Sequence, residues 1–215
     1  SLRQLAELKG DAHTAEHIND LRAAIRSTFH HTLFDVERGC YADANIDGQL
    51  SAKVSEHGNM APIWAGLCDG QRAQQTICNI FESDNSTTFT EAQPFFMAVV
   101  LVGLDKAGRF DLALDLIRRR WGKRMLEKGA TSVFEESQHG GYVRHESFRG
   151  FLRTHSHAWS ACPADFLIRR LMGVEILEPG CRKVRVTPRK TTFDYHAVFP
   201  TPLGPVTAEC TNGEV

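Results

Sequence analysis

The chain has 215 residues, of which 42% are apolar and 24% are charged, and its formal net charge is -1. This length suits one sizeable core or a large piece of a bigger one, and the composition is that of an ordinary soluble globular chain. The bulk charge gives no indication of a nucleic-acid or membrane partner.

The six cysteines are scattered, without a C-x-x-C pair or a metal-like grouping. We interpret them as free core thiols, because disulfide frameworks belong to shorter, cysteine-dense secreted chains. The cellular compartment stays open on this evidence.

Helical periodicity dominates the first part of the chain. Between Thr14 and Phe34, apolar residues recur every three or four positions, which predicts a helix packed on one side; they are Ile18, Leu21, Ile25, Phe29 and Leu33. His13 and His17 lie one helical turn apart and could hold a metal, but the absence of a visible third ligand favours a solvated helix face.

A loop or short hairpin is expected over residues 34–50, where Gly, Asp and Asn are frequent. Turn chemistry explains Asp43 and Asp47 more simply than a site does. Residues 51–68 predict a second helix that breaks at Pro62, and residues 69–81 predict a third. The pattern around Trp64 favours a core position over a ligand position.

Residues 95–104 form an apolar run too short to cross a bilayer, which needs about 20 residues. It predicts a helix buried on all sides, in the middle of a large core. Residues 109–129 predict an amphipathic helix that ends at Gly129; its inward residues would be Leu112, Leu114, Ile117, Trp121 and Met125. The alternation of one-sided and fully buried helices favours a partial α/α toroid, with an inner and an outer ring.

The character of the sequence changes near its end. A short helix is expected over residues 163–172, opened by Pro163 and closed by Gly173. From Val174 onward, alternating apolar and polar residues predict short antiparallel strands. The predicted fold is therefore mainly α, with a helical portion over residues 1–173 and a short antiparallel β-sheet region over residues 174–215.

A polar, glycine-rich interval between these helices, Gly129 to Ser160, is the part where function is expected. On spacing alone, Glu135 and Glu136 fit a capping box behind Thr131 or Ser132, with a catalytic carboxylate as the alternative. His155 and His157 are either ligands or residues that flank a helix cap at Ser156.

Three segments carry a resemblance to a known family: GATSVFEES, SHAWSACPADFLIRRLMGVEILEPG and KVRVTP, in that order. Together with the earlier RGCYADANIDGQLS and SEHGNMAPIWAGL, they resemble the C-terminal half of the catalytic region of glycoside hydrolase family 78, the α-L-rhamnosidases. The similarity runs from about Thr14 to Val206.

This resemblance implies an (α/α)6 barrel followed by a C-terminal β-sandwich, a rhamnoside as the carbohydrate ligand, and no cofactor. It implies that Glu135 is the general base and that His157 lies at the sugar site. Trp159 and Trp64 are further candidates for sugar binding, and no metal ligand is assigned. Phe134 departs from the family pattern, in which a tryptophan is usual, and so does the continuation ESQHGGYVRHESFRG.

The family's general acid comes from a motif upstream of any residue present here. We therefore expect a truncated or degenerate piece with roughly half a barrel and little or no hydrolase activity alone. It would need the missing N-terminal half, or it would self-associate through exposed helices. Glu136, Asp43 and Asp47 are candidate internal acids if the chain is active.

Two other functions stay open from the sequence. The chain could be a non-catalytic carbohydrate-binding or protein-interaction module, with the flank of residues 95–104 as the exposed surface. Metal-dependent hydrolysis through the ten histidines is the third hypothesis.

Overall fold

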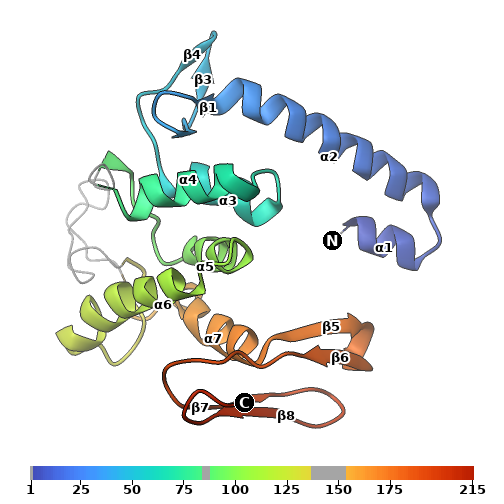
Figure 1. Ribbon diagram of the computed structural model, residues 1–215, viewed down its shortest axis with the longest axis vertical. Helices are drawn as coiled ribbons and strands as arrows, with labels where there is room; N and C mark the ends of the chain where they lie inside the picture. Colours follow the sequence, from blue (N-terminus) through green and yellow to red (C-terminus); the bar gives the residue numbers. More distant parts are fainter. Residues whose placement is uncertain (1, 84–87, 137–153) are drawn as a thin grey trace. The chain divides into compact units, whose positions relative to one another are not determined.

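The structure is a computed structural model that describes residues 2–83, 88–136 and 154–215 (Figure 1). Contacts divide the chain into two compact units, Ser1–Glu91 and Ala92–Val215, called here the first and the second unit. The prediction of a mainly helical chain with short antiparallel strands is confirmed. Within the described ranges, no helix combines the length and the apolarity needed to cross a bilayer.

The first unit consists of helices and two small hairpins. Its elements are α1 (Leu2–Leu8), α2 (Ala12–Leu33), β1 (Phe34–Asp35), β2 (Cys40–Tyr41), β3 (Asn45–Ile46), β4 (Gln49–Leu50), α3 (Glu56–Ala65) and α4 (Gly70–Phe81). The expected hairpin is present twice, since β1 pairs with β2 and β3 with β4, both antiparallel. Asp47 stands at the β3–β4 turn with a φ of 52°, so its role there is the expected turn chemistry.

The predicted break at Pro62 is wrong. Helix α3 runs through Pro62 and ends at Gly66, whose φ is 72°. Both ends are well satisfied, which offsets the hydrogen bond that proline removes. The Ser55 hydroxyl accepts a bond from the Gly58 amide (3.1 Å), and the Pro62 carbonyl accepts one from the Leu67 amide (2.8 Å).

Tyr41 and Asn59 organise the core of the first unit, and both are fully buried. The Asn59 amide group accepts a bond from the Tyr41 amide (2.8 Å) and donates to the Tyr41 carbonyl (3.0 Å), which joins α3 to β2. The Tyr41 hydroxyl lies 2.6 Å from Nδ1 of His30 on α2. Burial raises the pKa of Tyr41, so the phenol stays protonated.

The stripe predicted for α2 is covered only in part: Ile18, Phe29 and Leu33 are half-buried, and the Phe29 ring lies 5.0 Å from that of Tyr41. Leu21 is 52% exposed and Ile25 45%, and Ala15 is the buried residue that α2 contributes. Helix α1, which the periodicity did not predict, packs on α2 and also exposes its leucines. The predicted helix is present, and the expectation that it packs on one side holds for its C-terminal part but not for Leu21 and Ile25.

The described residues of the second unit, 92–136 and 154–215, form further helices and four strands. They are α5 (Met97–Lys106), α6 (Phe110–Ile117), the π-helix η2 (Arg118–Lys123), the 3₁₀-helices η3 (Leu126–Lys128), η6 (Ala158–Ala161) and η7 (Pro179–Cys181), α7 (Cys162–Met172), and the strands β5 (Val174–Glu178), β6 (Lys183–Val186), β7 (Tyr195–Phe199) and β8 (Val206–Cys210). The single helix expected over residues 109–129 is thus divided into α6, η2 and η3. As expected, Gly129 ends it with a φ of 83°.

Helix α5 is largely enclosed by its own unit. Val100, Leu101 and Leu104 are fully buried, and the helix contacts α6 and α7. Burial is not complete, because Phe95, just before the helix, is 60% exposed. The extended apolar flank that an interaction module would present is therefore mostly covered at this helix.

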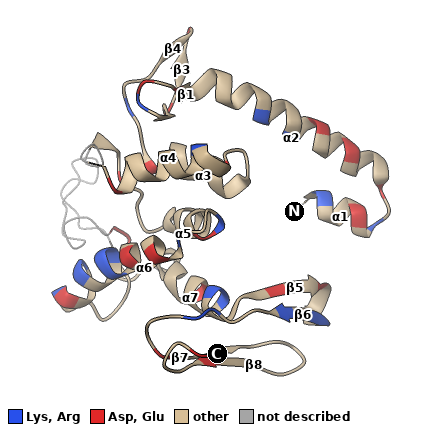
Figure 2. Cartoon of the chain, in the orientation of Figure 1, with Lys and Arg blue, Asp and Glu red and all other residues tan. Residues whose placement is uncertain are grey.

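The strands form two antiparallel hairpins, β5–β6 and β7–β8, beside α7. Met172, Val174, Ala197 and Phe199 make their shared core. Figure 2 marks acidic residues on β5 and basic residues on β6, and Glu175 pairs with Arg185 across the hairpin at 2.8 Å.

The largely buried carboxylate of Asp105 joins the helices of this unit to the region of its strands. Asp105, on α5, binds the guanidinium groups of Arg189 (2.7 Å) and Arg170 (3.4 Å). Arg189 also lies over the ring of Phe110, at 4.1 Å from its centroid. These contacts tie the segment after β6 to α5, α6 and α7.

Candidate functional site

The two ends of the polar interval lie side by side in the second unit. The amide of Glu135 donates to the carbonyl of Thr154 (3.0 Å), and the amide of His157 donates to the carbonyl of Val133 (2.9 Å). These bonds pair the segment before the interval with the segment after it. Residues 137–153, which include all of the ESQHGGYVRHESFRG departure except its first residue, Glu136, lie outside the described residues.

The capping-box interpretation is wrong. Residues 131–136 are not helical, so neither Thr131 nor Ser132 caps a helix there. The Ser132 hydroxyl instead lies 3.2 Å from the Ser156 hydroxyl on the paired segment. Ser156 also does not cap the next helix, because His157 is the residue that precedes η6. The positions of Glu135 and Glu136 are therefore set by the pairing of two distant segments and not by a helix N-terminus.

Glu135 is half-buried, and its carboxylate faces the paired segment. Its Oε2 accepts a hydrogen bond from the amide of Thr154 at 3.3 Å. The bond draws the side chain toward the segment that carries His157. A carboxylate held in this way has a fixed position, which a general base requires.

Phe134 packs between the two paired segments. It is 4% exposed, and its ring stacks on His155 with 4.3 Å between centroids. Its carbonyl accepts a bond from the buried Ser160 hydroxyl (2.5 Å). The residue that differs from the tryptophan usual in the family is therefore a packed residue next to Glu135 in the chain.

His157 begins a row of aromatic rings. It stacks on Trp159 with 3.9 Å between centroids, and Trp159 lies 4.9 Å from Phe95. Trp159 is 42% exposed. Nδ1 of His157 is buried and has no hydrogen-bond partner in the described structure. Such a buried polar atom costs about 1–3 kcal/mol and calls for an explanation, of which a functional role is one.

The π-helix η2 binds the backbone next to two members of this row. Its consecutive residues Arg120 and Trp121 are both buried. Arg120 donates to the carbonyl of Ala92 (3.2 Å), close to Phe95 in the chain, and Trp121 donates to the carbonyl of Ser160 (2.7 Å), next to Trp159. Single π-helical turns are rare overall and are frequent at functional sites.

The other predicted site residues are elsewhere in the chain. Trp64 belongs to α3 in the first unit and is 44% exposed, so the core interpretation is wrong. Asp43 accepts a bond from the capping residue Ser55 (2.7 Å), which gives that acid a structural role. Glu136 is half-buried beside Glu135. Phe95 was missed because it opens an apolar run and was counted as part of a helix.

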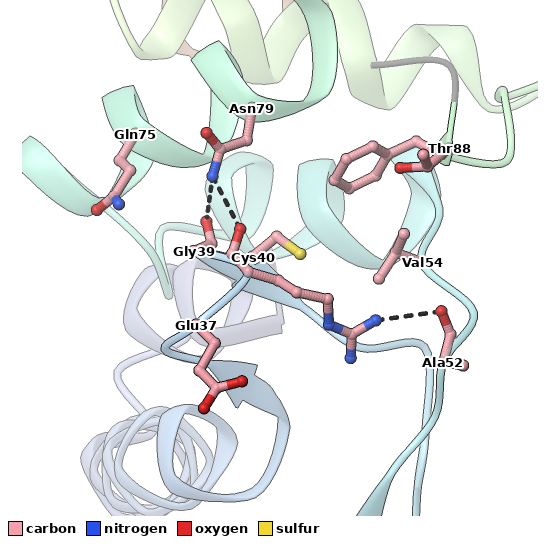
Figure 3. Close-up of a pocket in the computed structure, with 10 residues that line it drawn as sticks. Glu37, Gly39, Cys40, Ala52, Val54, Gln75, Asn79 and Thr88 are labelled. Carbon is pink, nitrogen blue, oxygen red and sulfur yellow. Dashed lines mark hydrogen bonds between the residues drawn. The ribbon is translucent and has the colours of Figure 1, made fainter. Parts of the chain in front are cut away.

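A cavity of about 570 Å³ lies in the first unit (Figure 3). Glu37, Gln75 and Phe89 are among its lining residues. Asn79 closes one side by donating to the Gly39 carbonyl (3.1 Å), and a side chain at Gly39 would meet the Asn79 amide at 2.7 Å. None of the four residues predicted for catalysis or sugar binding lines this cavity. Within the ranges described, no cluster of three or more His, Cys, Asp or Glu is placed to hold a metal ion.

Comparison with solved structures relates the chain to rhamnosidases. A GH78-family rhamnosidase of Bacillus sp. GL1 matches 96% of this chain at a TM-score of 0.80 and 27% identity. A rhamnosidase from Klebsiella oxytoca, solved with rhamnose bound, matches 78% at a TM-score of 0.64 and 20% identity, which speaks for the fold alone. No family model and no curated protein matches the sequence.

The chain spans 22% of the length of the Bacillus protein and 31% of the Klebsiella protein. It therefore has the structure of a portion of a GH78-like rhamnosidase. The resemblance inferred from the sequence motifs is confirmed at this level.

Proposed function

We propose that this chain is the base-carrying portion of a glycoside hydrolase of the α-L-rhamnosidase type, which releases terminal α-L-rhamnose with inversion. The observation that carries the proposal is the match to a GH78-family rhamnosidase over 96% of this chain. The pairing of the Glu135 and His157 segments supports it, because it brings the two residues implied by the resemblance onto neighbouring segments.

In the proposed mechanism, Glu135 removes a proton from a water molecule that attacks the anomeric carbon of rhamnose. Inversion requires a second carboxyl group roughly 6.5 to 9.5 Å away, which protonates the leaving oxygen from the other side of the sugar. That general acid would come from the remainder of a larger protein. Asp43 is an unsuitable substitute, because its carboxylate is engaged by Ser55.

Sugar binding is assigned to His157 and Trp159, with Trp64 as a further candidate. The stacked imidazole and indole present a flat apolar surface with polar edges, which suits the alternating C–H and hydroxyl faces of a pyranose. No cofactor or metal takes part in this proposal.

The architecture proposed for the intact protein is an (α/α)6 toroid followed by a β-sandwich. Residues 1–173 would supply part of the toroid and residues 174–215 the start of the sandwich. The succession of helices α2 to α7, followed by β5 to β8, supports this order.

The decisive test places this chain inside a complete enzyme. The matched portion of the Bacillus GH78 rhamnosidase is replaced by these residues, and release of rhamnose from an aryl rhamnoside is measured. We expect activity that falls by about 10²- to 10⁴-fold on Glu135→Gln, the usual contribution of acid–base catalysis. Glu127→Gln, an exposed acid of the same unit, is the matched control.

The purified chain alone should bind L-rhamnose weakly and hydrolyse little or no rhamnoside. Robust hydrolysis by the chain alone would contradict the missing-acid part of the proposal. Chimera activity that survives Glu135→Gln would remove Glu135 from its role. The structural match does not favour the alternative of a non-catalytic binding or interaction module, which predicts rhamnose binding together with an inactive chimera.

A further inference from the structure

We propose that Phe95 is a specificity-determining residue that contacts the group attached to rhamnose on the leaving side. The chemistry it would take is a flat apolar face joined to the glycosidic oxygen, either an aryl aglycone or the C–H face of a second sugar. This inference rests on the proposed function, because it takes Glu135 and His157 as the end of the site that holds the rhamnose itself.

Exposure is the first observation. Phe95 is 60% exposed although it directly precedes the well-buried helix α5. It does not stand alone, since it extends the row that begins at His157 and passes through Trp159, with rings 3.9 and 4.9 Å apart. A surface of several adjoining aromatic rings that is exposed to solvent is more often a ligand-binding surface than an accidental exposure.

The rigid support beneath the row is the second observation. Phe95 and Trp159 come from segments far apart in the sequence, yet three contacts bring these segments together. Arg120 binds the carbonyl of Ala92, Trp121 binds the carbonyl of Ser160, and the Cys162 thiol lies 3.8 Å from the carbonyl of Pro94. A ring held in place before a ligand arrives loses little entropy on binding, so its exposed face contributes more affinity.

Direction is the third observation. Glu135 lies on the paired segment next to Thr154, at the His157 end of the row. Phe95 stands at the opposite end, beyond Trp159. In an inverting displacement the base acts on one face of the sugar and the leaving group departs from the other. We therefore place the leaving group at the Phe95 end of the row, where Phe95 contacts Trp159, and the water at the His157 end, whose segment is paired with that of Glu135.

The experiment compares ligands that differ in the group attached to rhamnose. Dissociation constants of the full 215-residue chain are measured by titration calorimetry for L-rhamnose, methyl α-L-rhamnoside, phenyl α-L-rhamnoside and a rhamnosyl-glucose disaccharide. We expect phenyl rhamnoside to bind about 2- to 10-fold more tightly than methyl rhamnoside, the range that aromatic contacts give. A gain for the disaccharide instead identifies a second sugar as the group that Phe95 contacts.

Phe95→Ala should abolish this gain and leave the affinity for L-rhamnose unchanged. Phe95→Leu keeps an apolar side chain without the aromatic face, so it should lose most of the gain while preserving the fold, checked by circular dichroism. Leu203→Ala truncates an apolar residue of the same unit that is 75% exposed, more than Phe95, and it should leave every affinity unchanged.

The outcomes separate the two proposals. If L-rhamnose binds but neither larger ligand gains affinity, or the gain persists in Phe95→Ala, the role of Phe95 is overturned and the proposed function stands. If L-rhamnose and all rhamnosides fail to bind, the proposed function fails and the role of Phe95 fails with it.

Discussion

Phe134 illustrates how a single side chain at the site depends on its surroundings. It stands where the related family usually has tryptophan, and in this chain its ring packs against His155 while its carbonyl holds Ser160. The substitution thus acts on the support of the neighbouring Glu135 and not on an open pocket surface. Predictions about Glu135 therefore concern a carboxylate whose position is set by backbone bonds to Thr154.

Cysteine reactivity tests burial at the same residue scale. All six cysteines are free, as predicted, but they differ in environment. Burial raises the pKa of Cys162 to about 12, so its thiol stays protonated and unreactive near neutral pH. Cys78 is exposed on α4.

We expect iodoacetamide at pH 8 to modify Cys78 in the folded chain well before Cys162, with both modified after denaturation. Peptide mass spectrometry of a time course measures the order. The denatured sample serves as the control for intrinsic reactivity. Modification of Cys162 as fast as Cys78 in the folded chain would show that the start of α7 is not packed as described.

At the scale of elements, Gly173 is the position at which the backbone tolerates a side chain least. It ends α7 with a φ of 60°, and a Cβ atom there would lie 2.0 Å from the carbonyl oxygen of Thr187. A side chain would meet both the left-handed conformation, which costs about 1–2 kcal/mol, and a backbone clash, which costs about 1–3 kcal/mol. Gly129 also has a positive φ, 83°, but nothing lies within 4 Å of its Cβ position.

Gly173→Ala should therefore lower the free energy of unfolding by about 2–5 kcal/mol, and Gly129→Ala by about 1–2 kcal/mol. Urea denaturation followed by circular dichroism measures both. Equal losses in the two variants would mean that the contact between the end of α7 and Thr187 does not exist in solution.

The sequence predicted most elements because their signals are local. Periodicity predicted α2, α4, α5 and α7, Pro163 and Gly173 bounded α7, and alternation predicted β5 to β8. It failed where long-range contacts decide the structure. The pairing of residues 133–135 with 154–157 joins segments about 20 residues apart, so local spacing favoured a capping box instead.

The candidate site was predicted to a similar degree. The Glu135 and His157 segments were correctly placed in one interval, but their roles came from family resemblance and stay predictions. Phe95 and Arg120 were missed for physical reasons. Each hydrogen bond of a π-helix spans one residue more than in an α-helix, and a search for a 3.6-residue repeat does not detect this change at Arg120. Phe95 is apolar like the rest of its run, so the sequence does not show that it is exposed whereas Met97, Val100 and Leu101 are buried.

At the scale of the whole molecule, the main unexplained surface is the apolar face of α1 and α2. Leu5 is 59% exposed, Leu21 52% and Ile25 45%. Single exposed leucines are ordinary, but several on two helices in contact suggest a surface that a partner covers. A second copy of the chain is the partner available when the protein is purified alone.

We expect the isolated chain to self-associate through these helices, with an average mass in sedimentation experiments that rises with concentration. Leu21→Glu combined with Ile25→Glu places two charges in the apolar stripe and should weaken association by at least about tenfold, since each 1.4 kcal/mol corresponds to that factor. Leu126→Glu, at an exposed position of the second unit, should have no effect. A wild-type chain that remains monomeric at its highest soluble concentration would contradict self-association. The partner that covers this face would then be the rest of a longer polypeptide, as the toroid proposal requires.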